Sequence, residues 1–253
     1  MPIDMGAMRG AVVIALLAAC SSSAPPASSP ATPIEATAQL PPERLTPAPS
    51  IDWKDGNFVT TGLPAVARAG EVLVLAYRDN DQARGFPNLR IEVRDKHDAT
   101  VWKVPVLLPT EYEQVAPDGT MTPELARRIG HANAELKRLH GVHDFVPMHP
   151  LELLRPSEGD PHLATGDGID VDWDLDHLHV FRRNSDREIT SRSGVAWLEP
   201  DHQSCDSCEV CKNPAFLAGV FHAPAIDLVL VELGYKGTDA CWQPSDQFHV
   251  VAW

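Results

Sequence analysis

The sequence predicts a mainly β globular domain with one amphipathic helix, arranged as a β-sandwich or as two packed β modules. Residues 71–77 form an apolar, β-prone run that a polar stretch with Gly and Pro follows. Residues 89–93 then alternate apolar and charged side chains, which is typical of a half-buried strand. Only residues 123–140 carry apolar side chains at clear helical spacing. Strand patterns therefore outnumber helical ones.

Several further segments have strand-like patterns. A proline inside the first of them, Pro105, predicts an edge strand or a bulge because proline cannot donate to a β-ladder. A shift in the apolar phase predicts a turn at Asp174 to His177, between two hairpin arms. The expected strands are residues 101–108, 169–173, 178–181, a short strand around 189, 194–198, 227–233 and 248–253.

The single helix has recognisable start and stop signals. Thr122 is a good N-cap, Pro123 suits the first helical position, and Glu124 favours the positive end of the helix dipole. Gly141 is the expected stop. The apolar stripe between these signals predicts a helix packed on a sheet; it consists of Leu125, Ile129, Ala132, Leu136 and Leu139.

The globular domain is expected over residues 51–253. It is long enough for one sizeable core or for two small modules, about 51–115 and 160–253, with the helix between them. Residues 71–93 and 227–251 share a pattern of apolar strand, polar loop and second strand, although their identity is negligible. A duplication would explain this pattern, but any two hairpins look alike to this extent, and that explanation is preferred.

The N-terminus has the features of a secretion signal. Arg9 precedes the apolar run 11–19, which is too short for a bilayer span of about 20 residues and ends in small residues. The sequence Leu17-Ala18-Ala19-Cys20 resembles the lipobox of bacterial lipoproteins. This resemblance implies a signal peptide at 1–19, cleavage before Cys20, and lipid, including palmitate, on that cysteine.

A low-complexity segment follows the lipobox cysteine. Residues 21–50 are dominated by Ser, Ala, Pro and Thr, a composition that cannot bury enough apolar surface to fold. With Cys20 they are expected to form a lipidated, disordered tether over residues 20–50. By resemblance to lipoproteins with Ser rather than Asp after the cysteine, Ser21 implies sorting to the outer membrane of the cell envelope.

The charge balance limits the partners. The chain has a net charge of -14, which repels nucleic acid and anionic lipid headgroups. Binding to nucleic acid is therefore not expected, and contact with the membrane should come through the lipid anchor.

Four cysteines remain beyond Cys20. An exported chain enters an oxidising compartment, and an even number of thiols there favours two disulfides. Alternatives are a four-thiolate zinc site, for which the Cys-x-x-Cys spacing is suitable, and an iron–sulfur cluster, for which Ala215 stands where a cysteine is expected. The cysteines are Cys205, Cys208, Cys211 and Cys241.

One segment is rich in aspartate and histidine. Alternating aspartates can bind calcium through oxygen ligands, and two histidines at i, i+2 can chelate zinc. The segment departs from the EF-hand template, since Leu175 and Phe181 occupy its glycine and glutamate positions, and a solvated strand face with an Asp-rich turn is the alternative. The candidate ligands are Asp170, Asp172, Asp174, Asp176, His177 and His179.

Sequence motifs for catalysis are absent: neither Gly-x-Ser-x-Gly, a phosphate-binding glycine loop nor His-Glu-x-x-His occurs. The sequence therefore favours a non-enzymatic, envelope-anchored domain that binds or scaffolds an unknown envelope protein or ligand, with no cofactor beyond the lipid. The alternative is a metal-binding protein or metal-dependent enzyme that uses calcium or zinc in region 167–179.

Overall fold

Strands dominate the fold, as predicted, and the sheets of the described residues are antiparallel. The computed structural model describes residues 46–79, 85–116, 118–155, 159–174, 177–183, 185, 187–193, 215–235 and 245–253, all of which belong to one compact unit, residues 44–253. Within these residues the only α-helix is α1 (Pro123–His143), accompanied by the short 3-10 turns η1 (Tyr112–Gln114) and η3 (Pro224–Ile226). No helix in this part of the chain is long and apolar enough to cross a membrane.

The strands form three larger sheets and one hairpin. The hairpin pairs β1 (Ser50–Lys54) with β2 (Asn57–Thr61). The sheet nearest the helix, called the helix-side sheet, has the order β6-β5-β4-β3-β7. Its strands are β3 (Ala65–Ala67), β4 (Val72–Tyr77), β5 (Leu89–Asp95), β6 (Thr100–Leu107) and β7 (Phe145–Pro147).

The second half of the chain supplies the other two sheets. The central sheet has the order β16-β15-β14-β8, with β8 (His149–Pro150), β14 (Phe216–Ala223), β15 (Leu228–Gly234) and β16 (Gln247–Ala252). The outer sheet has the order β13-β12-β11-β10-β9. Its strands are β9 (Glu152–Leu154), β10 (Leu163–Gly166), β11 (Ile169–Asp174), β12 (His177–Arg182) and β13 (Glu188–Ser193).

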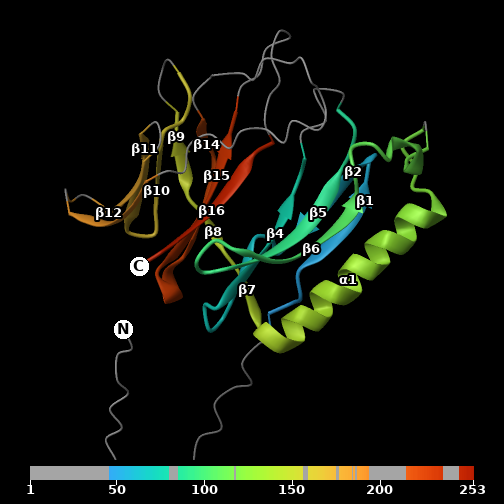
Figure 1. Ribbon diagram of the computed structural model, residues 1–253, viewed down its shortest axis with the longest axis horizontal. Helices are drawn as coiled ribbons and strands as arrows, with labels where there is room; N and C mark the ends of the chain where they lie inside the picture. Colours follow the sequence, from blue (N-terminus) through green and yellow to red (C-terminus); the bar gives the residue numbers. More distant parts are fainter. Residues whose placement is uncertain are drawn as a thin grey trace, which may run out of the picture. The chain divides into compact units, whose positions relative to one another are not determined.

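Three apolar cores hold these layers together. One lies between α1 and the helix-side sheet, a second between the helix-side and central sheets, and a third between the central and outer sheets. Figure 1 shows this order from α1 on the right to β11 and β12 on the left. Side chains alternate faces along β4: Val74 packs toward the helix, whereas Leu73 and Leu75 pack toward the central sheet. Apolar packing thus runs without interruption from α1 through the helix-side and central sheets to the outer sheet.

The helix begins as predicted but ends later. The Thr122 side chain accepts a hydrogen bond from the Leu125 amide at 3.2 Å, which confirms the N-cap. The predicted stop at Gly141 is wrong, because the helix continues to His143. Asp144 provides the C-cap in a left-handed conformation (φ 49), which aspartate tolerates better than most residues.

Most predicted strands are confirmed within the described residues. β6 is an edge strand, and its register with β5 shifts beside Pro105, so the predicted edge and the predicted irregularity both occur there. The turn predicted at Asp174 to His177 is too long, because cross-strand pairing continues through both of these residues. The strand expected at 194–198 lies outside the described residues, as do the signal segment, most of the tether and the four cysteines beyond Cys20.

Candidate functional site

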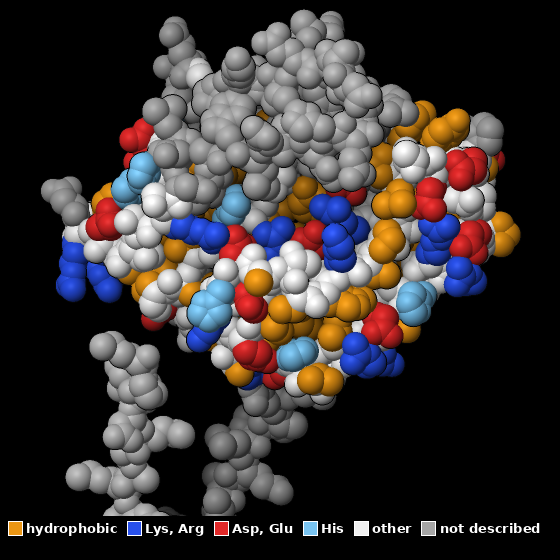
Figure 2. Space-filling model, in the orientation of Figure 1, with side chains coloured by type: hydrophobic (Ala, Val, Ile, Leu, Met, Phe, Trp, Pro, Cys, Tyr) orange, Lys and Arg blue, Asp and Glu red, His pale blue; other side chains and the backbone are white. Residues whose placement is uncertain are grey.

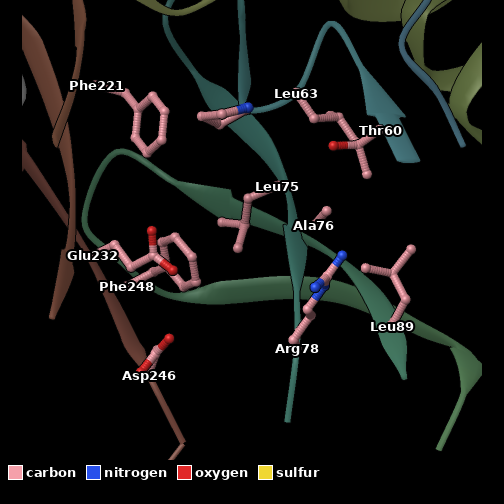
Figure 3. A pocket seen from close by; sticks show the side chains of 11 residues that line it. Thr60, Leu63, Leu75, Ala76, Arg78, Leu89, Phe221, Glu232, Asp246 and Phe248 are labelled. Carbon is pink, nitrogen blue, oxygen red and sulfur yellow. The ribbon is translucent and has the colours of Figure 1, made fainter. Parts of the chain in front are cut away.

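A cavity of about 440 Å³ lies between the helix-side sheet and the central sheet. Its size is in the range of small-molecule sites. Figure 3 shows strands of the central sheet on one side of it and residues of β4 and β5 on the other. Its apolar walls are made by Leu63, Leu75, Ala76, Leu89, Phe221 and Phe248.

A carboxyl group enters the cavity from a strand that is otherwise apolar. Along β15, Leu228 and Leu230 pack toward the helix-side sheet, whereas Val229 and Val231 pack toward the outer sheet. Glu232 continues the first row by the alternation of strand side chains, and it lines the cavity. Glu232 is therefore an acid in a row of otherwise apolar side chains.

The neighbouring strands leave room for this acid. Across β15 the register pairs Glu232 with Gly219 on one side and with Phe248 on the other. A Cβ atom at Gly219 would lie 2.7 Å from Oε2 of Glu232, closer than two such atoms can approach. Glycine at this position allows the carboxyl group to lie flat beside β14.

Two further charged residues line the same cavity. Asp246, just before β16, enters from the same side as Glu232, and Arg78, just after β4, faces them from the opposite side (Figure 3). Arg78 is exposed and donates a hydrogen bond to the Phe58 carbonyl at 3.2 Å. Within the described part of the chain, no hydrogen bond or ion pair satisfies either carboxyl group. The two acids are therefore available to a ligand.

The surroundings shift the protonation of both acids. Burial, reinforced by the negative charge of Asp246, raises the pKa of Glu232 to about 7, against a smaller opposing effect of Arg78. Burial also raises the pKa of Asp246. Near neutral pH the pair can therefore hold or release a proton, and each group can accept hydrogen bonds from a donor in the cavity.

A second polar cluster, the Asp98 cluster, joins all three sheets. The Asp98 carboxylate lies 3.0 Å from Arg94 Nη1, 2.9 Å from Arg192 Nη1 and 3.1 Å from His249 Nδ1. Burial raises the pKa of Asp98, but hydrogen bonds and charge from His249, with further help from Arg192, bring the net pKa below its ordinary value. Glu92, 2.9 Å from Arg94, supplies the second negative charge, so the two arginines have two carboxylates and the cluster ties the sheets together.

The same side chains cover the outer edge of β16. The Val250 amide donates to Asp98 at 3.0 Å, and the Val250 carbonyl accepts from Arg192 at 2.8 Å. Arg94 donates to the Phe248 carbonyl. Backbone groups that would otherwise be unpaired at this edge are thereby satisfied.

A histidine cluster lies on the opposite face of the central sheet. His149 and His222 are cross-strand partners, and their Nδ1 atoms lie 3.1 and 3.4 Å from the same oxygen, Oδ2 of Asp167. The longer contact does not have hydrogen-bond geometry, so both ring nitrogens of the buried His222 lack a partner. Burial lowers the pKa of His222 despite the nearby carboxylate, which favours the neutral ring.

The Asp/His-rich segment of the metal hypothesis forms the hairpin β11–β12. Across it the register pairs Asp172 with His179 and Asp174 with His177, which brings these four residues to one face. Asp176 lies outside the described residues. Among the residues with a described placement, no three His, Cys or acidic side chains are grouped so that they could hold a metal ion.

Sequence reasoning missed the cavity residues. A charged residue within an apolar strand, as in Leu230-Val231-Glu232-Leu233, was an available signal for Glu232. Asp246 and Arg78 stand in polar segments without a distinctive pattern, and β14, which carries Gly219, was not predicted. Only the tertiary fold brings these residues together.

The fold and the cavity define a class: a β-rich domain with a ligand-sized cavity between two sheets. Comparison of the chain with protein-family models, curated proteins and solved structures finds no match. On the face shown in Figure 2, acidic, basic and apolar side chains of the described residues are interspersed.

Proposed function

We propose that this chain is a lipid-anchored binding protein of the bacterial cell envelope, and that the cavity between its helix-side and central sheets is the ligand site. The observation that carries this proposal is the cavity itself. It combines apolar walls with two carboxyl groups, Glu232 and Asp246, that the described fold leaves without a partner. A half-buried carboxyl group without a protein partner can accept hydrogen bonds from a ligand, and the cavity is large enough to hold a small molecule.

Anchoring is proposed from the sequence. The lipobox-like Leu17-Ala18-Ala19-Cys20 and the Ser/Ala/Pro-rich residues 21–50 are typical of a lipid attachment site followed by a tether. In a flexible chain of thirty residues the mean reach is about 30 Å, enough to hold a binding domain near, but off, the membrane surface. We therefore expect ligand capture close to the membrane.

The cavity is tested with a neutral probe and a variant that fills it. Leu75 lines the cavity on the side of Glu232, so Leu75→Trp should occlude it, whereas Leu154→Trp makes the same change at an exposed position on β9. We expect 2-phenylethanol to shift NMR signals of cavity residues in the wild-type chain and in Leu154→Trp, but not in Leu75→Trp. Shifts that persist in a folded Leu75→Trp chain would place binding elsewhere and contradict the proposed site.

Anchoring is tested independently by changing the lipobox cysteine. Cys20→Ala should abolish lipid attachment, so the chain should leave the membrane fraction or remain unprocessed. Ser21→Ala, which keeps the cysteine, is the matched control and should fractionate as the wild type does. A Cys20→Ala chain that is processed and still sediments with membranes would contradict the anchoring proposal.

A further inference from the structure

We infer that the cavity selects ligands with a positively charged amine on an apolar body, an inference that rests on the proposed ligand-binding function. The class is that of primary or secondary alkylammonium and arylalkylammonium ions. Its members combine a strong hydrogen-bond donor with an apolar surface. The cavity offers carboxyl groups to accept from the donor and apolar walls to contact the surface.

The charges in the cavity favour a cation. Glu232 and Asp246 are partly buried and lack partners among the described residues, whereas Arg78 is exposed, solvated and hydrogen-bonded to a carbonyl. The two acids are therefore less exposed to solvent than the arginine, and neither has a neutralising partner among the described residues. An ammonium ion would supply both the charge and the donors that they lack.

The apolar part of the site favours an organic cation over a metal ion. Phe248 is the direct cross-strand neighbour of Glu232, and Phe221 lines the cavity beside it (Figure 3). Aromatic faces attract ammonium groups and also pack against apolar chains. Calcium would require six to eight oxygen ligands, whereas the cavity offers two carboxyl groups and an opposing guanidinium.

Amine binding should be linked to the proton on Glu232. The titratable or charged groups that face it are Asp246, next to β16, and Arg78, next to β4, while β14 contributes only Gly219 at the paired position. In the empty cavity the pKa of Glu232 is about 7. An ammonium ion binds the ionised carboxylate, so binding should lower this pKa and release a proton at neutral pH.

The test compares three probes of nearly the same shape by calorimetry on the full chain in detergent. The probes are 2-phenylethylamine, which is a cation, 2-phenylethanol, which is neutral, and phenylacetate, which is an anion. The amine keeps its charge over the whole range used, since its pKa is near the ~10.4 of lysine. Measurements in phosphate and in Tris buffer reveal the proton released.

We expect the amine to bind at least about tenfold more tightly than the alcohol at pH 8, and phenylacetate to bind most weakly. The affinity for the amine should fall about tenfold from pH 8 to pH 6, as the ionised fraction of Glu232 falls. In Glu232→Gln the preference for the amine and the proton release should both be lost. Glu152→Gln, which changes an exposed acid on β9, should retain both.

The outcomes separate this inference from the proposed function. If the alcohol or phenylacetate binds as tightly as the amine, and Leu75→Trp abolishes that binding, the cavity is a ligand site but the inference is wrong. If amine binding survives Leu75→Trp, or no probe binds at millimolar concentration, the inference and the proposed cavity function are both wrong.

Discussion

Replacing the cavity acid Glu232 with glutamine should stabilise the fold at high pH and leave it almost unchanged at low pH. In the unfolded chain Glu232 loses its proton near pH 4.5, and in the folded chain only near pH 7. Between these values the folded state binds the proton more tightly, so the stability falls as pH rises. Above pH 7 the folded protein carries the whole cost of a charged group in the cavity.

The two pKa values set the magnitude. Their difference of about 2.5, at about 1.36 kcal/mol for each pKa unit, corresponds to about 3 kcal/mol. Glutamine is nearly the same shape and stays neutral at every pH. The Glu232→Gln variant should therefore exceed the wild type by about 3 kcal/mol at pH 8 and match it closely at pH 4.

Urea unfolding of both proteins from pH 4 to pH 8 measures this difference directly. The exposed acid of Glu152 supplies the control, because Glu152→Gln should follow the wild-type curve throughout. A stability difference between Glu232→Gln and wild type that stays constant from pH 4 to pH 8 would refute the reasoning.

Three further predictions concern the cores and the polar clusters. Asp98→Asn should cost about 1–3 kcal/mol in urea unfolding at pH 7, because Arg192 loses its counter-charge while Arg94 keeps Glu92 at 2.9 Å; an unchanged stability would contradict this. A loss in the same direction should appear in the wild type as pH falls through the lowered pKa of Asp98. Leu136→Ala empties a fully buried position in the core under α1 and should cost about 2–5 kcal/mol, whereas the exposed Val142→Ala should cost far less. Gly219→Ala should displace the Glu232 carboxyl group and weaken amine binding in calorimetry with little change in stability; unchanged affinity would show that the acid does not need this space.

The sequence predicted the fold class because its strongest patterns are local. The Thr122 cap, the apolar stripe of α1 and the apolar–charged alternation that predicted β5 each act within a few residues, and the predicted cap, helix and strand all occur in the structure. The helix end was misjudged because Gly141 is a weaker stop than the left-handed Asp144. Strand β14 was missed because its glycine and alanine residues dilute the apolar pattern.

The candidate site could not be predicted in the same way. Arg78 and Glu232 are separated by more than 150 positions in the sequence and face each other only because the central sheet packs on the helix-side sheet. Even so, an acid in an apolar strand was visible as an anomaly. The sequence instead predicted a metal site in the segment 170–179. Clustered histidine and aspartate are a stronger sequence signal than a single glutamate in an apolar strand.

The covered edge of β16 has a consequence for the membrane anchoring proposed above. Proteins tethered to a bilayer diffuse in two dimensions, where neighbours meet far more often than in bulk solution. An open edge strand under such crowding is a template for sheet-to-sheet association. Asp98, Arg94 and Arg192 occupy the amide and carbonyl positions that a neighbouring strand would need. If the chain is anchored as proposed, these three side chains would oppose strand-to-strand polymerisation and keep neighbouring molecules separate.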